Sequence, residues 1–453
     1  MYIERISKKF IVPLLTLIIA GCLGDTEQLE ELPSPIQLSE ERESAFNADA
    51  SNRAGWWKPI VAKDGMLSIV FNFDGHEESG CKENSNHKLT LATKFDNQSW
   101  EYVTAKLKNR NRYWSACDDL GHRQPTIAID GDGRVHVWAG MHSEPDGCCY
   151  FTFQHDLEEF EQNDAFQNKG SFTYPIPAAA PNGDIFLAIR NLPDSQSDSE
   201  VNRFEGQGEL HTWNNGNKEW RKVSSFAAHT FTEHGSNAIA YPDDLYVDSN
   251  GIVHILWEWA VNSTSDRRYL GSYLKFDPVQ QVFLTADNEM VFEPVNLSTL
   301  TELPSLTFEP SNPFLDRGDY IQSAKLEYDG DYCSPCIVYR VLGNKGNNIA
   351  FTRWNDGDWA KPELLYSSNI NSFATIDASI DEDKFTVYYA LVGEGVYKSS
   401  KSMTSDNWSH SVLYESESAD IRLSLAAQYQ TKILYISELN DNANGATIKI
   451  LSL

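Results

Sequence analysis

Three histidines, His122, His136 and His142, lie within one stretch of 21 residues, where their imidazoles could act as general acid and base. An Asp-Gly turn at 132–133 separates two apolar runs of this stretch, which predicts a β-hairpin. His122 precedes the first strand and His142 follows the second, so we expect both imidazoles at the same rim. His136 alternates with two valines inside the second strand and is expected to be structural. His122 and His142 are therefore the candidate acid–base residues.

Aromatic and basic residues suited to binding an anionic group follow in two later stretches. Tyr174 stands in the motif Phe-Thr-Tyr-Pro and Tyr241 in Ala-Ile-Ala-Tyr-Pro, each at the beginning of a predicted strand unit. Arg190 and Arg203 occur in the unit that Tyr174 opens. An inward-facing arginine is costly on an acidic chain unless an anionic ligand neutralises it. Arg203 is therefore a candidate catalytic residue, and Arg190, with the tyrosines Tyr174 and Tyr241 expected near the axis, is a candidate substrate-binding residue. The alternative is that the tyrosines are core residues and that Arg203 forms an exposed ion pair.

The elements that must position these residues are short strands, because almost no helical periodicity follows residue 50. Seven polar turns each precede a strand rich in Val, Ile, Tyr, Phe and Trp, and successive turns are about 68, 50, 68, 79, 52 and 49 residues apart. Repeats near 50 residues with several strands each are typical of β-propeller blades. We predict an all-β, seven-bladed β-propeller over residues 51–453; the alternative is a two-sheet sandwich followed by a second β domain. The turns lie at 64–65, 132–133, 182–183, 250–251, 329–330, 381–383 and 430–431.

The two ends of the predicted ring must be joined. The last unit has room for only three strands after Ile421, so closure should borrow a strand from residues near 46–57. The longest gap holds an insertion at about 284–313, rich in Pro, Glu and Thr, which we expect to form a loop over one face. Four units end in a polar turn followed by a tryptophan that should pack an outer strand: Trp100, Trp220, Trp359 and Trp408.

The N-terminus resembles an export signal. Residues 1–22 combine three basic residues with an apolar run of 11 residues, shorter than the roughly 20 that span a bilayer. The run ends in Ile-Ala-Gly-Cys22, which resembles a bacterial lipobox and predicts acylation of Cys22, for example with palmitate. Leu23 after that cysteine favours the outer membrane, and the acidic residues of 23–50 predict a solvated tether. An ordinary signal peptide with a chance cysteine is the alternative.

Charge and cysteine usage limit the classes of partner. Formal charges of 37 basic and 65 acidic residues give −28, which excludes a general nucleic-acid binder. The pair Cys333-Ser-Pro-Cys336 predicts a local disulfide or free thiols rather than a redox or zinc motif, because no second such pair accompanies it. His and Cys otherwise lack ligand spacing, so we assign no zinc site and no cofactor, and we leave open a structural metal ion. We expect a monomer. Four further cysteines have no assigned partner: Cys81, Cys117, Cys148 and Cys149.

The motifs together resemble those of the BNR-repeat polysaccharide lyases, and among them the ulvan lyases with seven-bladed propellers. The resemblance is closest over 118–260, through His-x-x-Pro-x-Ile-Ala-Ile-Asp, Val-His-Val-Trp-x-x-Met-His, Thr-Tyr-Pro, Asn-Arg-Phe and Ala-Tyr-Pro. It implies β-elimination on a uronic acid within a sulfated algal polysaccharide, which needs a masked carboxylate, a base and an acid. It further implies His122 as base or acid with His142 beside it, Arg203 on the uronate carboxylate, and Tyr241 lining the site.

One departure from that family concerns its catalytic tyrosine, expected directly before an arginine in the third blade. Here the pair is Ile189-Arg190. Either Tyr174 or Tyr241 substitutes, one histidine serves as both base and acid, or the chain has lost the chemistry. The rival functions are a non-catalytic glycan-binding lipoprotein of the cell surface, a propeller that docks proteins, and a sialidase-like glycoside hydrolase. The hydrolase ranks below the lyase because the chain has no proper Ser-x-Asp-x-Gly-x-x-Trp box.

Overall fold

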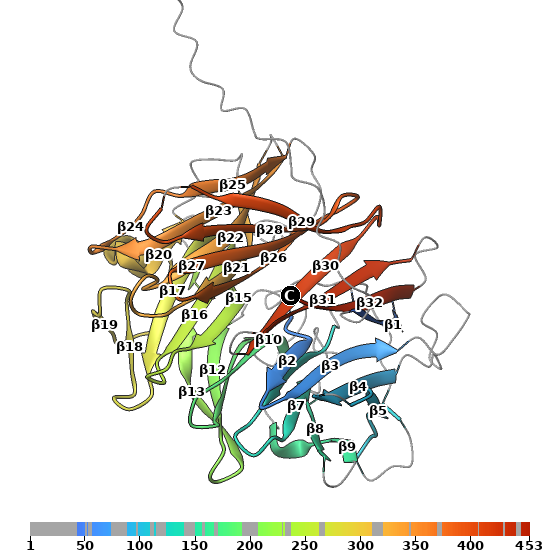
Figure 1. Cartoon of the computed structure of the whole chain (residues 1–453). Helices are drawn as coiled ribbons and strands as arrows, with labels where there is room; N and C mark the ends of the chain where they lie inside the picture. Colours follow the sequence, from blue (N-terminus) through green and yellow to red (C-terminus); the bar gives the residue numbers. More distant parts are fainter. Residues whose placement is uncertain are drawn as a thin grey trace, which may run out of the picture.

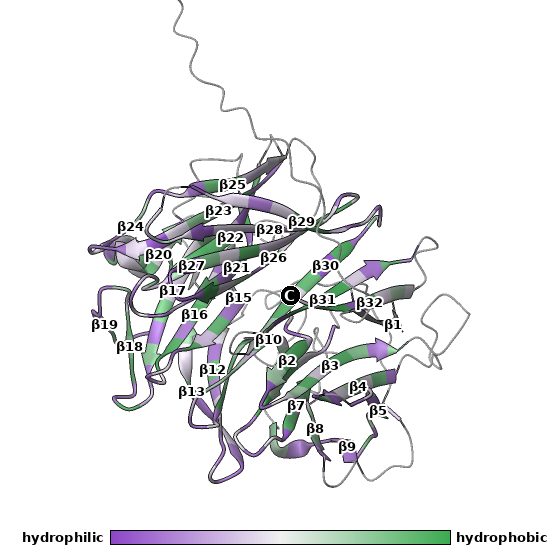
Figure 2. Ribbon diagram, viewed as in Figure 1, coloured by the Kyte–Doolittle hydropathy of each residue, from purple (hydrophilic) through white to green (hydrophobic). Residues whose placement is uncertain are grey.

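Seven antiparallel sheets surround a common axis in the computed structural model of the chain, which is an all-β, seven-bladed β-propeller (Figure 1). Hydrophobic residues concentrate in the strands and hydrophilic residues at the turns and outer edges (Figure 2). The structure describes residues 43–49, 52, 57–73, 88–96, 98–108, 113–114, 124–139, 150–155, 159–166, 171–192, 207–228, 230–231, 237–261, 268–309, 320–343, 346–368, 374–405, 407–428, 431–440 and 445–453.

The first three blades are four-stranded, and each is numbered outward from the axis. Blade 1 contains β2 (Ile60–Lys63), β3 (Met66–Phe73), β4 (Lys88–Phe95) and β5 (Glu101–Thr104). Blade 2 contains β6 (Thr126–Ile129), β7 (Val135–Trp138), β8 (Tyr150–Gln154) and β9 (Glu159–Gln162), followed by the 3₁₀ turn η4 (Asp164–Phe166). Blade 3 contains β10 (Ser171–Ala179), β11 (Ile185–Leu192), β12 (Gln207–Asn214) and β13 (Glu219–Ala227).

Blades 4 and 5 carry additional strands at their outer edges, and blade 4 also has a two-residue strand on the other side of its innermost long strand. Blade 4 contains β14 (Thr230–Phe231), β15 (Asn237–Val247), β16 (Val253–Val261), β17 (Tyr269–Asp277), β18 (Val282–Leu284), β19 (Met290–Val291) and β20 (Thr307–Glu309), with α1 (Leu297–Glu302) and η5 (Pro304–Leu306) before β20. Blade 5 contains β21 (Tyr320–Glu327), β22 (Cys336–Gly343), β23 (Gly346–Asn355), β24 (Asp358–Trp359) and β25 (Glu363–Ser368).

The last two blades complete the ring. Blade 6 contains β26 (Ala374–Asp381), β27 (Lys384–Leu391), β28 (Gly395–Ser402) and β29 (Ser409–Glu415). Blade 7 contains β30 (Ile421–Gln428), β31 (Thr431–Leu439), β32 (Gly445–Ser452) and, as its fourth strand, β1 (Glu43–Asp49).

The seven predicted turns are confirmed, since each joins the first strand of a blade to the second. In blades 1 to 5 the turn glycine has φ between 79 and 87°, a left-handed conformation that only glycine adopts at no steric cost. The Asx-Gly pairs that mark the repeat are therefore a backbone requirement of these five blades. The four tryptophans also pack outer strands as expected; Trp220, for example, lies with its ring 5.6 Å from that of Trp138.

The predicted closure is confirmed by β1, which pairs antiparallel with β32 from Glu43↔Leu451 to Asp49↔Gly445. Phe46 of this strand packs against blade 1, with its ring 5.9 Å from Phe71 and 5.1 Å from Trp100. The first and last strands of the ring thus meet within one blade, which removes exposed sheet edges. Because β1 lies inside the segment 23–50 expected to be a tether, the folded part of the chain includes residues 43–49.

The insertion expected as a loop over one face is instead an ordered outer layer. β20 pairs with β17, and α1 is capped by Asn296, whose side chain accepts hydrogen bonds from the backbone N–H groups of Ser298 and Thr299. Trp359 of blade 5 donates its indole N–H to the Ser305 carbonyl, 3.0 Å away. The polar composition of the insertion is typical of a loop, but its residues Leu300 and Leu306 are buried and hold the segment against the sheet.

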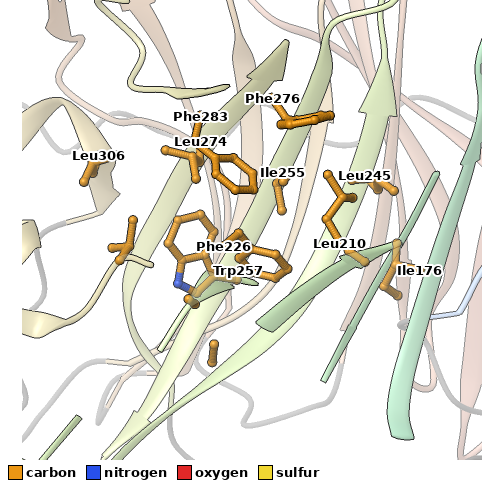
Figure 3. Packing of buried hydrophobic residues seen from close by; sticks show 14 of the residues in the cluster. Ile176, Leu210, Phe226, Leu245, Ile255, Trp257, Leu274, Phe276, Phe283 and Leu306 are labelled. Carbon is orange, nitrogen blue, oxygen red and sulfur yellow. The ribbon is translucent and has the colours of Figure 1, made fainter. Parts of the chain in front are cut away.

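An apolar cluster between blades 3 and 4 supports the inner strands that carry the site (Figure 3). Trp257 lies in its middle with no exposed surface, and the ring of Phe226 is 5.3 Å away. Burying a large apolar side chain contributes about 2–3 kcal/mol, so this cluster holds β15 and β16 firmly in place. The cluster further includes Ile176, Leu210, Leu245, Ile255, Leu274, Phe276, Phe283 and Leu306.

Candidate functional site

The structure brings three of the predicted site residues together. Tyr174 on β10, Arg190 on β11 and Tyr241 on β15 meet where blades 3 and 4 adjoin. Cys22, His122, His142 and Arg203 lie outside the described residues. The two strands between these histidines are described. They pair Thr126, four residues after His122, with Trp138, four residues before His142.

Arg190 is the centre of this group. Its guanidinium carbon lies 4.7 Å from the centroid of the Tyr174 ring and 4.4 Å from that of Tyr241. Nε and Nη2 donate to Oγ1 of Thr173, at 3.3 and 3.2 Å. Only 5% of Arg190 is exposed, and among the described residues no carboxylate forms an ion pair with it. The described residues thus offer this buried cation two π faces and one hydroxyl, and most of its N–H donors have no hydrogen-bond partner among them.

Tyr174 is held in a strained conformation. Its φ is 58°, in the left-handed region that residues with a Cβ rarely adopt. The cause is a register shift between Thr173 and Ile176, where Tyr174 and Pro175 bulge out of the ladder with β11. The strain costs on the order of 1 kcal/mol or more and places the Tyr174 ring 5.1 Å from that of Tyr241 and 5.3 Å from that of Trp57. Such strain persists only where the surrounding structure enforces it.

Arg268, which the sequence analysis did not single out, completes the group. Its guanidinium carbon lies 3.6 Å from the centroid of the Tyr241 ring, and its backbone carbonyl accepts from Ile321 N in blade 5. Only 5% of Arg268 is exposed. The only signal in the sequence was a pair of arginines at the beginning of a strand, which is common and has no motif around it.

Beside Arg268 lies a pair of buried acids, Asp243 on β15 and Glu258 on β16. Burial and the neighbouring Asp243 raise the pKa of Glu258 well above its usual range, and burial also raises the pKa of Asp243. Arg268 and Arg340 oppose the shift at Glu258 because their positive charges favour the ionised form. Arg340 is fully buried and donates through Nη2 to Gln322 Oε1. The acids and arginines thus form one electrostatic unit.

Ile189 faces away from this unit. Its side chain is fully buried in the apolar cluster between blades 2 and 3, among Trp138, Tyr150 and Phe172. Arg190, the next residue along β11, points to the opposite face of the sheet. Tyr174 and Tyr241 therefore flank Arg190 on the face of the sheet opposite to the Ile189 side chain. A phenol that replaced the tyrosine expected at position 189 would have to lie on the Arg190 face.

The described histidines on the second strands are structural, which confirms the expectation for His136. His136 Nδ1 lies 2.6 Å from the Tyr150 hydroxyl and Nε2 lies 3.3 Å from Asp130 Oδ2. Blade 4 repeats the arrangement: His254 Nδ1 is 2.7 Å from the Tyr273 hydroxyl. Both imidazoles are buried, which lowers their pKa and keeps them out of contact with any substrate.

An ionic network ties the inner strands together around the axis. Lys58 Nζ lies 2.6 Å from Asp244 Oδ1, and Asp244 Oδ2 accepts from Leu326 N at 2.9 Å. Asp377 Oδ2 accepts from Leu425 N at 2.7 Å. These contacts link blade 1 to blade 4, blade 4 to blade 5 and blade 6 to blade 7. The network fixes the relative positions of the innermost strands of these blades.

The remaining features concern metals, disulfides and membranes. Cys333 and Cys336 form a disulfide, so of the two predicted states the oxidised one is present. Within the described ranges, no group of three or more His, Cys, Asp or Glu side chains is arranged to hold a metal ion. None of the helices in this part of the chain has the length and apolar character needed to cross a bilayer.

Comparison with known proteins agrees with the fold. The family model described as "BNR repeat-containing family member" matches residues 56–365. Among solved structures, a PL25 ulvan lyase superposes with a TM-score of 0.67 at 12% identity, covering 89% of this chain and 93% of the lyase. The same kind of lyase bound to -[GlcA(1-4)Rha3S]- gives 0.67 at 12% identity, with coverage of 90% and 95%. The polysaccharide lyase Uly1 gives 0.59 at 11% identity, with coverage of 88% and 90%. No curated protein sequence matches this chain significantly. At such identities the likeness concerns the fold alone.

Proposed function

The chain belongs to the BNR repeat-containing family, and from that premise we propose that it is a polysaccharide lyase acting on a uronic acid of a sulfated polysaccharide such as ulvan. The observation that carries the proposal is Arg190, a buried guanidinium held by Tyr174 and Tyr241 with no carboxylate partner among the described residues. A uronate carboxylate would supply the missing negative charge, and sugar rings pack well against aromatic faces.

The proposed reaction is a β-elimination. A base removes the proton from C5 of the uronate, the electron pair forms the C4=C5 double bond, and the C4–O4 bond breaks as an acid protonates the leaving oxygen. We assign base and acid to His122 and His142, and we assign the neutralisation of the carboxylate to Arg203 together with Arg190. Each acid–base group contributes roughly 10²–10⁴-fold to the rate, so loss of His122 should be crippling.

A second candidate function is glycan binding without turnover, and Ile189 is the observation that favours it. The position at which the related lyases would have a tyrosine is here an aliphatic side chain packed in the core. Binding through Arg190 and the two tyrosines would survive this change, whereas proton transfer by a tyrosine at position 189 would not.

Incubation of the full-length protein with ulvan separates the two functions. The lyase predicts growing ultraviolet absorbance from unsaturated uronate ends, abolished in His122→Ala and unaffected in His136→Gln that remains folded. Binding of ulvan without any absorbance change would support the glycan-binding function. Absence of both turnover and binding would contradict the proposal.

We further propose that the protein is exported and held at the outer membrane by lipid on Cys22. The disulfide between Cys333 and Cys336 supports an oxidising compartment, where such bonds persist. In a Gram-negative host, Cys22→Ser should abolish incorporation of labelled palmitate and release the protein from the membrane fraction. Retention of the label in that variant would contradict the proposed anchor.

A further inference from the structure

We propose that Trp57 binds the acidic sugar at this site: its indole N–H donates a hydrogen bond to a carboxylate or sulfate oxygen, beside the guanidinium of Arg190. The proposal rests on the proposed function, because it adds a residue to the same site and names the group that this residue recognises. Trp57 is a binding residue and takes no part in the proton transfers.

Trp57 reaches the site from another part of the ring. It precedes β2 of blade 1 by three residues, yet its ring packs in the apolar cluster between blades 3 and 4, 5.3 Å from the ring of Tyr174. The Tyr174 ring in turn lies 4.7 Å from the guanidinium carbon of Arg190. Trp57 is 3% exposed and Arg190 is 5% exposed, so the two side chains are enclosed to a similar degree. A sugar that reaches the guanidinium therefore comes close to the indole as well.

The backbone at Trp57 is fixed by the contacts of its neighbour, Lys58. Lys58 N donates to Thr126 Oγ1 at 3.1 Å, and the Lys58 carbonyl accepts from Ile127 N at 2.9 Å, both in blade 2. Lys58 Nζ donates to the Leu245 carbonyl at 2.9 Å, in blade 4. A segment held from two blades loses little freedom when a ligand binds, so the indole is preorganised as a donor.

The indole Nε1 of Trp57 has no hydrogen-bond partner among the described residues. An indole nitrogen only donates, and a buried donor without an acceptor bears the full cost of its lost hydration. The guanidinium of Arg190 also only donates, and most of its N–H groups likewise lack a partner among these residues. Two such donors against one tyrosine ring favour a ligand group that only accepts hydrogen bonds, as an ionised carboxylate or a sulfate does.

Trp257 provides a contrast within the same apolar cluster. Its indole N–H also lacks a partner among the residues that the structure describes. Its ring packs against those of Phe226 and Trp259, at 5.3 and 6.2 Å, whereas Trp57 lies against a tyrosine that stacks on a cation. An unpartnered indole is therefore not a sign of a ligand by itself. At Trp57 it coincides with the buried arginine.

The first experiment compares the full-length wild type with Trp57→Phe, which keeps an aromatic ring and removes the N–H. In calorimetric titration with an ulvan tetrasaccharide, we expect the affinity to fall about 10- to 150-fold, the contribution of a hydrogen bond to a charged group. The matched control is Trp257→Phe, which removes the other unpartnered N–H and should leave the affinity unchanged. Equal affinity in the wild type and Trp57→Phe, or equal losses in the two variants, would overturn the proposal.

A desulfated tetrasaccharide identifies the acceptor. The difference in affinity between the wild type and Trp57→Phe should persist with this ligand if the N–H binds the carboxylate, and it should disappear if the N–H binds the sulfate. Either result supports an anionic acceptor. A difference that is the same for a tetrasaccharide with neither anionic group would overturn the proposal, because the N–H would then bind a hydroxyl group.

A second experiment keeps the indole and so avoids a substitution that could impair folding. A fluorinated tryptophan is introduced at position 57 alone, and its fluorine NMR signal is followed as the tetrasaccharide, sodium glucuronate or sodium sulfate is added. We expect the signal to shift with the tetrasaccharide and with at least one of the two anions, and the same label at position 257 to stay unchanged.

The label also distinguishes failure of this proposal from failure of the proposed function. Binding of the tetrasaccharide without a shift at position 57 would overturn the proposal and leave the proposed function intact. If the tetrasaccharide does not bind the wild type, the proposed function is refuted. The response of the label to glucuronate and sulfate would still decide whether the indole binds an anion.

Discussion

Replacement of Arg190 by methionine should separate the role of this residue in binding from any role in folding. Methionine fills much of the same volume without charge, and it removes two cation–π contacts, at 4.7 and 4.4 Å, worth about 1–2 kcal/mol each when desolvated. Burying a cation costs several kcal/mol, and Arg190 is 5% exposed with no carboxylate partner among the described residues. The substitution removes this cost. The two effects nearly cancel, so the free energy of unfolding should change by no more than about 2 kcal/mol in either direction.

Binding should respond very differently. A charge-assisted pair between guanidinium and carboxylate contributes about 1.5–3 kcal/mol, so Arg190→Met should weaken binding of an ulvan tetrasaccharide about 10- to 150-fold. Urea unfolding and calorimetric titration measure the two quantities on the same sample. The control is Arg134→Met in blade 2, where the arginine donates to Gln154 and no change in affinity is expected. A variant that loses much more stability than this and binds as tightly as the wild type would refute the reasoning.

Three further predictions concern the scaffold. Burial raises the pKa of Asp130, but hydrogen bonds from His136 and two backbone amides outweigh it and hold the pKa at about 2, below the unfolded value. The ionised Asp130 therefore stabilises the fold above about pH 4, and this contribution is lost as the pH falls from about 4 to about 2. In urea unfolding, the stability difference between wild type and Asp130→Asn should therefore shrink on acidification; a constant difference would contradict this. Replacing both Cys333 and Cys336 by alanine should cost about 2 kcal/mol, because the loop closed by the disulfide is short, and should leave ulvan binding unchanged. Phe46→Ala should cost about 3 kcal/mol by emptying the contact between β1 and blade 1, and a calorimetric Tm equal to that of the wild type would show that the closure is not needed for stability.

The seven-bladed ring could be predicted because the turn that recurs in its blades requires a particular backbone conformation, which the residue types reveal. The Asx-Gly turns need positive φ in each of the first five blades, so the sequence carries the repeat even where the strands differ. The borrowed strand could be predicted only approximately, because Phe46 is the one large apolar residue in β1. The insertion was mistaken for a loop because two buried leucines hold a segment of otherwise polar composition.

The site could be predicted only in part. Tyr174, Arg190 and Tyr241 were found by residue type, but their stacking depends on the register shift at Pro175, which no local pattern reveals. Arg268 and the acids Asp243 and Glu258 were missed. A pair of buried acids on neighbouring strands is defined by how the strands pack and by exclusion of water, and it has no sequence motif.

The central claim is that an acidic sugar binds against Arg190 between Tyr174 and Tyr241, and a crystal structure of the full chain with a bound ulvan tetrasaccharide tests it most directly. We expect electron density for a uronate carboxylate within about 3 Å of a guanidinium of this cluster, with His122 or His142 within hydrogen-bonding reach of C5 or O4 of that sugar. A tetrasaccharide bound elsewhere on the propeller, with no anionic group at the arginines, would contradict the account.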